Sequence, residues 1–209
     1  MTVADVGANI GIYTLYAARL VGPAGRVYSF EPAPRTFELL KDNIQVNGFL
    51  EAGIIDARCQ AVLDRSGECE LTVYSDNSGH NTLFAGQQAG ETVRAETVSL
   101  DQALDGVARL DVVKVDAEGA EPFVLRGMSR LLARNPGLQI LTEFAPVHLR
   151  RAGVDPASYL DEITRMGFEI FRIDDMDGAL HKEPSADLLG AHSANLYLKR
   201  DASRHGVAG

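Results

Sequence analysis

The residues with the clearest chemical pattern lie at the start of the chain, in the segment Val3–Gly11. This segment reads as a short buried strand that runs into a glycine-rich turn and then into a helix. Backbone N–H groups at such a junction attract electron-rich atoms, so the segment predicts a site for the polar part of a nucleotide-like ligand. Its spacing is Asp-x-Gly-x-x-x-Gly from Asp5 to Gly11. The three-glycine dinucleotide fingerprint is missing, because Asn9 stands where the middle glycine would be.

A second candidate is Glu31, which lies 20 residues beyond Gly11. An acidic residue at this offset accepts hydrogen bonds from the hydroxyl groups of a ribose. The alternative interpretation is a carboxylate that stabilises the start of the following helix through the helix dipole. With Asp5 at the end of the first strand, the turn favours S-adenosylmethionine over a ligand that carries a pyrophosphate.

The elements that must position these residues alternate between strand and helix along most of the chain. Such repeats predict an α/β fold, a doubly wound and mostly parallel sheet with helices on both faces. The expected strands are Thr2–Val6, Arg26–Phe30, Ile54–Cys59, Val112–Val115, Leu138–Thr142, Glu169–Ile173 and Asn195–Leu198. The expected helices are Ile10–Leu20, Pro34–Val46, one that starts at Pro122 and continues to Leu132, and Pro156–Met166.

The region from about Gly67 to Leu100 departs from this alternation. Strands are expected at Glu70–Tyr74 and Thr92–Val98, and the residues between them are rich in Ser, Asn, Gly and Gln. This pattern predicts an inserted hairpin or loop. The chain shows no internal repeat and no linker, so we expect one domain over residues 1–200 and a frayed tail over residues 201–209.

Ligands of an open parallel sheet gather at the carboxyl ends of the strands, near the point where the strand order reverses. Polar residues at strand ends therefore matter more than polar residues elsewhere. In the predicted sheet these are Asp5 and Gly7, Glu31, Asp116 and Glu118, and Glu143.

At these positions the chain resembles the FkbM-type S-adenosylmethionine-dependent methyltransferases. The similar motifs are Asp5-Val-Gly-Ala-Asn-Ile-Gly11, Phe30-Glu31-Pro32 and Lys114-Val-Asp-Ala-Glu-Gly-Ala-Glu121. The third motif is the most specific, and the resemblance extends from residue 2 to about residue 200. It implies the seven-stranded methyltransferase variant of the sheet, and transfer of a methyl group to a hydroxyl of a small metabolite or sugar.

The resemblance also implies S-adenosyl-L-methionine as cofactor and a role for each motif residue. The turn residues would contact the methionine part, Glu31 would bind the ribose, residues after the third strand would lie along the adenine, and Asp116 would sit near the sulfur. The implied contacts are Asp5, which would help to hold the amino group, and Gly7, Ala8, Asn9, Gly11, Glu31, Pro32, Ala61, Val62 and Asp116. A helix cap is the alternative role for Asp116.

A neutral hydroxyl must lose its proton as it attacks, and a nearby carboxylate or imidazole can take that proton. The candidates are Asp116, Glu118, Glu143 and His80, with His148 as a weaker one. Glu143 follows an apolar strand, where burial would raise its pKa, although it could instead cap backbone donors. His80 lies in the polar insertion, which could fold over the ligand.

Composition limits the partners that we expect. The net charge is −9 and the sequence pI is about 5.0. This acidic balance disfavours nucleic acid and anionic membranes, so a small hydroxylated molecule is the expected acceptor. The sequence holds neither an apolar run of about 20 residues nor a signal peptide, and the default expectation is a cytoplasmic protein.

The two cysteines and the five histidines suggest neither a disulfide framework nor a zinc site. Magnesium held by Asp116, Glu118 and Glu143 is a disfavoured alternative, and no metal is expected. Two other functions stay open. One is a non-catalytic or N-terminally truncated domain that binds an adenosine ligand, and the other is an NAD-dependent oxidoreductase, which Asn9 argues against.

Overall fold

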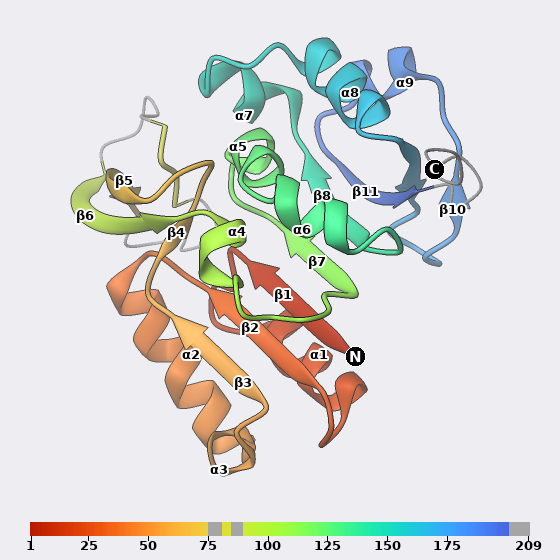
Figure 1. The fold of residues 1–209 in the computed structure, drawn as a ribbon. Coiled ribbons are helices and arrows are strands. Elements are labelled where there is room, and N and C mark those ends of the chain that lie inside the picture. The colour runs from red at the N-terminus through yellow and green to blue at the C-terminus, as the bar shows by residue number, and fades with distance from the viewer. Residues whose placement is uncertain (75–80, 85–89, 201–209) are drawn as a thin grey trace.

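The computed structural model describes residues 1–74, 81–84 and 90–200. Its centre is a sheet of eight strands, drawn in Figure 1. In spatial order these are β10 (Leu180–His181), β9 (Phe168–Ile173), β11 (Ala194–Arg200), β8 (Gln139–Phe144), β7 (Val112–Val115), β1 (Thr2–Val6), β2 (Arg26–Phe30) and β3 (Ile55–Arg58).

The sheet is mostly parallel. β1 pairs in parallel with both β2 and β7, so the strand order reverses between β1 and β7. β11 runs antiparallel to β8 and to β9, and β10 runs antiparallel to β9. The predicted doubly wound α/β fold is confirmed. The sheet has eight strands, one more than the seven predicted, because the two-residue β10 is too short to be recognised in the sequence.

Helices connect the strands and cover the sheet (Figure 1). They are α1 (Ile12–Val21), α2 (Pro34–Val46), α3 (Phe49–Ala52), α4 (Leu100–Ala103), α5 (Glu121–Arg126), α6 (Ser129–Arg134), α7 (Pro146–Arg151), α8 (Pro156–Arg165) and α9 (Ser185–Gly190). The helix expected to run on from Pro122 is divided into α5 and α6. The chain passes close to Leu63 between them, where a Cβ on Gly127 would lie 2.2 Å from the Leu63 carbonyl oxygen.

A second, three-stranded sheet contains β4 (Ala61–Val62), β6 (Glu91–Val98) and β5 (Gly67–Val73) in that order. β5 and β6 form the antiparallel hairpin that the sequence predicts. In Figure 1 the arrowheads of β1, β2, β3 and β7 point toward the side on which this sheet lies. The insertion therefore lies at the carboxyl ends of the parallel strands.

The core lies on both sides of β1 and β7 and includes Phe30, Val113 and Phe144, all fully buried. α1 packs against the sheet through the buried Thr14 and Ala18, and its Leu15 and Val21 are half-buried against neighbouring apolar clusters. Tyr16 and Leu20, whose spacing predicts this helix, are 68% and 67% exposed. Both cysteines are free thiols. In the part of the chain that the structure describes, no helix is both long and apolar enough to cross a bilayer.

Candidate active site

A cavity of about 480 Å³ lies at the carboxyl ends of β1, β2, β7 and β8. Most residues singled out in the sequence line it, although they come from distant parts of the chain. These lining residues are Gly7, Ala8, Asn9, Glu31, Pro32, Ala61, Val62, Asp116, Glu118 and Glu143. The structure thus places the predicted cofactor contacts and the predicted acid–base residues in one cavity, at the strand ends where the sequence predicted them.

The glycine turn after β1 is fixed by hydrogen bonds within the protein. Gly7 N and Ala8 N both donate to the Phe30 carbonyl, at 3.0 and 2.9 Å. Asn9 N donates to Glu31 Oε2 at 2.9 Å, and Gly11 N donates to the Ala8 carbonyl at 2.9 Å. These N–H groups are therefore not free donors, and the turn contributes a shaped wall rather than the row of amides that the sequence suggested.

Gly7 has a φ of 72° and packs directly against the loop that follows β7. A Cβ at this position would lie 1.8 Å from the Asp116 carbonyl oxygen. Only glycine permits this approach, and the approach brings the β1 turn beside Asp116. The close approach of the β1 turn to Asp116 thus explains both why glycine stands at position 7 and how this wall of the cavity is shaped.

Glu31 lies at the end of β2 with only 5% of its surface exposed. Its Oε1 accepts from Ala33 N at 3.0 Å, at the start of α2, while Oε2 accepts from Asn9 N. Burial is the main cause that raises the pKa of this carboxyl to about 7, against the lowering effect of the two amides. Glu31 therefore combines both predicted features, a carboxylate at a helix start and a carboxylate in the cavity wall.

Asp5 and Gly11 do not line this cavity. Asp5 is 1% exposed, and its Oδ2 accepts from Thr14 Oγ1 at 2.6 Å in α1. Gly11 is the N-cap of α1 with a φ of 96°. Both residues hold the turn and the helix in place beneath the cavity.

Lys114 is a cavity residue that the sequence reasoning missed. Its Nζ donates to the Gly7 carbonyl at 3.0 Å and lies 3.4 Å from Asp5 Oδ1 and 3.6 Å from Asp116 Oδ2. The signal was a single lysine inside the apolar run Val112–Val115. The ammonium group of Lys114 thus contacts oxygen atoms of Asp5 and Gly7 at the β1 turn and of Asp116 in the loop after β7. It therefore connects these two segments.

Glu121 stabilises the loop after β7 by accepting hydrogen bonds from its backbone. Its side chain is buried, and Oε1 accepts from Ala117 N at 2.9 Å and from Gly119 N at 3.3 Å. Burial raises the pKa of its carboxyl to about 7. The sequence marks this residue only as part of a motif, because nothing in the spacing reveals a carboxylate that points inward.

Glu143 lies inside β8, paired with Asn195, because the strand extends two residues beyond the predicted end at Thr142. Burial raises the pKa of its carboxyl to about 7, and the negative charges of Asp116 and Glu118 act in the same direction. This agrees with the expected effect of its apolar strand. Glu118 in turn forms an ion pair with His148, with 3.0 Å between Oε2 and Nδ1.

Glu118, Glu143 and His148 each bring one ligand-type atom within 4.8 Å of the others, which is the kind of grouping that could hold a metal ion. The imidazole already faces a carboxylate, however: contact with Glu118 is the main cause that raises its pKa, and the negative charges of Glu118 and Glu143 act in the same direction. In the described residues these three side chains therefore form an acid–base cluster.

The insertion also contributes to the cavity. Asn81 and Leu83 line it, as does Gln60 before β4. Asn81 Oδ1 accepts from Tyr74 N at 3.0 Å and so connects the lining to the hairpin. His80, one of the predicted base candidates, lies outside the described residues.

A second cavity of about 580 Å³ adjoins the first and shares with it Tyr13, Lys114, Asp116 and Glu143. Its other walls are mainly apolar and come from α1 and the neighbouring face of the sheet, including Tyr16, Leu20, Leu141 and Leu196. The exposed apolar side of α1 is thus one wall of a groove that opens beside the acid–base cluster.

A doubly wound sheet with a glycine turn after β1, a carboxylate after β2 and acid–base groups after β7 and in β8 has the architecture of the Rossmann-like methyltransferases. Known structures agree. The crystal structure of methyltransferase FkbM from Methylobacillus flagellatus KT aligns with a TM-score of 0.59 and 16% identity, covering 94% of this chain and 43% of that chain. Fibrillarin from Aeropyrum pernix, solved with natively bound S-adenosyl-L-methionine, aligns with a TM-score of 0.50 and 14% identity, covering 94% and 65%.

At the level of sequence, the family model of the methyltransferase FkbM domain matches residues 5–170. The chain therefore belongs to the FkbM methyltransferase family.

Curated relatives include methyltransferase sdnD of Sordaria araneosa, which is 29% identical over 60% of this chain and 60% of that protein. The 31-O-demethyl-FK506 methyltransferase FkbM of Streptomyces tacrolimicus is 31% identical over 59% and 58%. The hexuronic acid methyltransferase AglP of Haloferax volcanii is 30% identical over 73% and 56%. The matched regions thus span about three fifths of the length of these relatives.

Proposed function

We propose that this chain binds S-adenosylmethionine in the 480 Å³ cavity and transfers its methyl group to a hydroxyl of a small metabolite or sugar. The observation that carries the proposal is the meeting of three features in one cavity. They are the β1 turn at Gly7–Asn9, the buried carboxylate of Glu31 and the carboxyl group of Glu143.

The chemistry of the residues that line the cavity supports the binding of this cofactor. Glu31 offers a carboxylate to the ribose hydroxyls, Pro32, Ala61 and Val62 supply a low-polarity wall for the adenine, and the turn with Asp116 borders the space left for the methionine part. In this proposal Asp5 and Gly11 act by holding the turn. When bound, S-adenosylmethionine supplies an electrophilic methyl group, so the protein chiefly has to align the acceptor.

Glu143 is the residue we assign as general base. It lines the cavity, and a carboxyl with a pKa of about 7 is well matched to taking a proton near neutral pH. Such a base contributes roughly 10²–10⁴-fold to the rate. Asp116 and Glu118 shape the charge around it, and the role of His80 stays a prediction.

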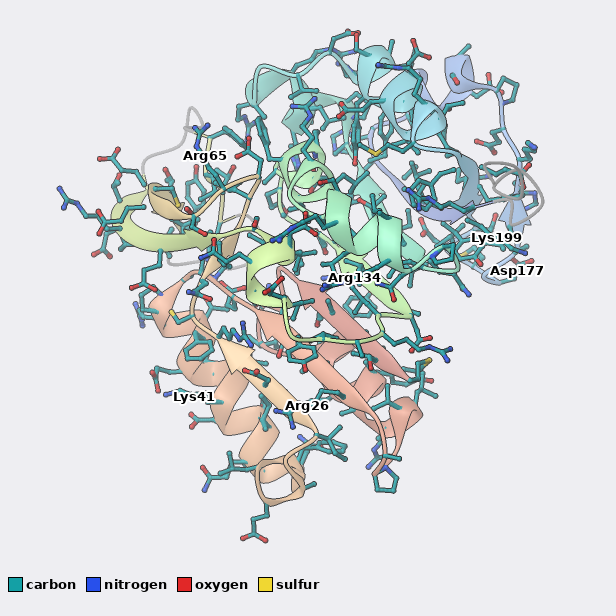
Figure 2. All side chains as sticks on the ribbon, viewed as in Figure 1. Arg26, Lys41, Arg65, Arg134, Asp177 and Lys199 are labelled. Atoms are coloured by element: carbon teal, nitrogen blue, oxygen red, sulfur yellow. The ribbon has the colours of Figure 1, made fainter. Side chains whose placement is uncertain are left out.

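Two relatives support a small hydroxylated acceptor, since their names refer to hexuronic acid and to the 31-O position of FK506. Charge points the same way. The net charge is −9, and the labelled cationic side chains Arg26, Lys41, Arg65, Arg134 and Lys199 lie apart from one another (Figure 2). An acidic balance of this kind disfavours binding to a nucleic acid or an anionic membrane.

The proposal is tested by thermal unfolding of the protein with S-adenosylhomocysteine and, separately, with NAD. At about 100 times its dissociation constant, a ligand of the native state adds about 2.7 kcal/mol to the free energy of unfolding. We expect S-adenosylhomocysteine alone to raise the melting temperature.

Stabilisation by NAD alone would reject the proposal in favour of an oxidoreductase. Stabilisation by S-adenosylhomocysteine, without methyl transfer to any of a panel of sugars and hydroxylated metabolites, would instead favour a domain that only binds an adenosine ligand.

A further inference from the structure

Three titratable side chains from three different elements meet at one edge of the cavity. Glu118 comes from the loop after β7, Glu143 from β8 and His148 from α7. One polar atom of each lies within 4.8 Å of the others. Both carboxyl groups line the cavity, and His148 lies behind them.

The ion pair between Glu118 and His148 is held in place by the backbone. Glu118 has a φ of 50°, which is a left-handed conformation, and its carbonyl accepts from Thr82 Oγ1 at 3.3 Å. The next residue, Gly119, packs so closely on α7 that a Cβ there would lie 2.8 Å from the His148 carbonyl oxygen. His148 Nδ1 is shielded from solvent and lies 3.0 Å from Glu118 Oε2, a charge contact whose angle is not that of a hydrogen bond. The imidazole therefore lies beside Glu143 with its Nδ1 facing Glu118.

Glu143 is surrounded by more negative than positive charge. Asp116 and Glu118 face it from the loop after β7 and disfavour its ionised form, and buried Glu121 lies close enough to interact with it. Two cations oppose them, Lys114 from β7 and His148 from α7. His148 belongs to the same cluster as Glu143, with ligand-type atoms within 4.8 Å, and it opposes the negative charge at Glu143 more strongly than Lys114 does.

We propose that His148 is a positioning residue whose positive charge, held beside Glu143 by Glu118, offsets part of the negative charge around Glu143 and so makes it easier for Glu143 to ionise and accept the proton of the acceptor hydroxyl. The proposal rests on the function proposed above. With the methyl donor bound, the hydroxyl oxygen would form a bond to the methyl carbon while the bond between that carbon and the sulfonium sulfur breaks, and the electron pair of the broken bond would stay on sulfur as the neutral thioether. The O–H bond would break at the same time, and its proton would go to Glu143, which becomes a neutral carboxylic acid.

The cluster predicts a definite titration of His148. Glu118 is the largest cause that raises the pKa of this imidazole above its ordinary value of 6.5, and Glu143 raises it further, while Arg151 acts the other way. Coupling between two groups is reciprocal, so a charge on Glu143 that stabilises the imidazolium is itself stabilised by the imidazolium. Histidine titration thus measures the interaction without an acceptor molecule.

The experiment is an NMR pH titration of protein labelled with ¹³C in its histidine rings, with the His148 signal assigned by its loss in His148→Gln. We expect the pKa of His148 to lie above 6.5 and to fall by about 1 unit in Glu118→Gln, as for loss of an opposite charge in contact. A smaller fall is expected in Glu143→Gln. Glu162→Gln, which removes the carboxylate of another ion pair, is the matched control and should leave His148 unchanged.

A reciprocal measurement covers the case in which Glu143→Gln does not fold. With ¹³C in the glutamate carboxyl groups, the pKa of Glu143 should rise in His148→Gln. Binding of S-adenosylhomocysteine by each variant, measured by calorimetry, separates this proposal from the proposed function, since the cluster can be disproved while the cofactor still binds.

Two results would overturn the inference. In the first, His148 titrates independently of both carboxyl groups. In the second, Mn²⁺ at micromolar concentration broadens the His148 signal in the native protein but not in Glu118→Gln, which would make the three residues a metal site.

Discussion

Three buried or half-buried carboxyl groups set the electrostatics of the site. The pKa of Glu31, Glu121 and Glu143 is in each case raised to about 7, with burial as the largest cause. Their structural roles differ, since Glu31 joins the β1 turn to α2, Glu121 holds the loop after β7, and Glu143 faces the acid–base cluster. Below its pKa such a carboxyl group is neutral, and its burial costs little folding free energy. Above its pKa the group ionises in a buried place, and the folded state loses stability.

The first prediction concerns Glu121→Gln and the pH dependence of stability. The folded-state pKa of about 7 exceeds the unfolded value of 4.5, so the folded protein binds the proton more tightly. This stabilisation is complete below pH 4.5 and is lost as the pH rises through 7. We expect Glu121→Gln to flatten the decline of the free energy of unfolding over this range, by up to about 3 kcal/mol. Urea titrations at several pH values check this.

Glu38→Gln is the control for this measurement, because the Glu38 side chain is 66% exposed. Its pH dependence should match that of the native protein. An unchanged slope in Glu121→Gln as well would show that this carboxyl ionises normally in the folded chain.

The second prediction concerns Glu31→Gln and cofactor affinity. The amide keeps the size of the side chain but removes the charge that would accept the ribose hydroxyls. A hydrogen bond to a charged group is worth about 1.5–3 kcal/mol, so the affinity for S-adenosylhomocysteine should fall roughly 10- to 100-fold. Calorimetry measures the affinity, and circular dichroism confirms the fold. An affinity equal to that of the native protein would remove Glu31 from the proposed ribose site.

Residue-scale prediction from the sequence succeeded where a residue is placed by the backbone. Glu31 and Asp116 follow strands that the apolar pattern locates, so their place in the cavity wall could be inferred. Lys114 acquires its role from a partner distant in the sequence, since Gly7 lies 107 positions before it. No local spacing records such a contact, whereas His148, five residues after Glu143, was a candidate from the sequence.

At the scale of elements, the connection between β1 and α1 is the feature on which the site depends most. The chain turns at Gly7, passes within contact of the loop after β7 and starts α1 at Ile12. Lys114 and the Phe30 carbonyl close this turn from two neighbouring strands. A change in the turn should therefore affect the cavity and the stability together.

The third prediction compares Gly7→Ala with Gly48→Ala. Both glycines have a positive φ, 72° and 75°, so both substitutions carry the strain of a left-handed alanine, about 1–2 kcal/mol. Only Gly7→Ala adds a clash, with the Asp116 carbonyl, since nothing lies within 4 Å of a Cβ at Gly48. We expect Gly7→Ala to lose more stability and to abolish binding of S-adenosylhomocysteine, and Gly48→Ala to bind normally. Equal losses in the two variants would contradict the close approach.

Elements were predictable from the sequence where their apolar runs are long. The strands of the parallel sheet follow the alternation of strand and helix patterns in the sequence, and the β5–β6 hairpin lies where that alternation is interrupted. The break between α5 and α6 was not predictable, because it depends on the contact of Gly127 with Leu63. The extension of β8 to Phe144 depends on pairing with β11, which is a tertiary effect.

At the scale of the whole molecule, the sheet carries two adjoining cavities, the first at the carboxyl ends of its central strands and the second along one face of these strands, from Met1 and Val112 to Glu143. The first holds the proposed cofactor site, and the second is an apolar groove along α1. The exposed apolar side of α1 reverses the usual rule that the apolar stripe of a helix faces the core. The sequence shows that stripe but not which way it faces.

The fourth prediction tests this orientation. The double variant Tyr16→Ser and Leu20→Gln changes two side chains that are 68% and 67% exposed, so the melting temperature should stay nearly unchanged. Leu40→Ala, at a fully buried position, should cost about 2–5 kcal/mol by leaving a cavity. Thermal unfolding compares the two. A large loss in the double variant would mean that the apolar side of α1 is packed in the folded protein.

The central claim is that the cavity between the β1 turn, Glu31 and Asp116 binds the methyl donor. The most direct test is a crystal structure of the protein with S-adenosylhomocysteine. We expect the ligand to lie in the 480 Å³ cavity, with both ribose hydroxyls hydrogen-bonded to Glu31 and its sulfur on the side of Asp116 and Glu143. Ligand density elsewhere, or a ribose without contact to Glu31, would contradict this claim.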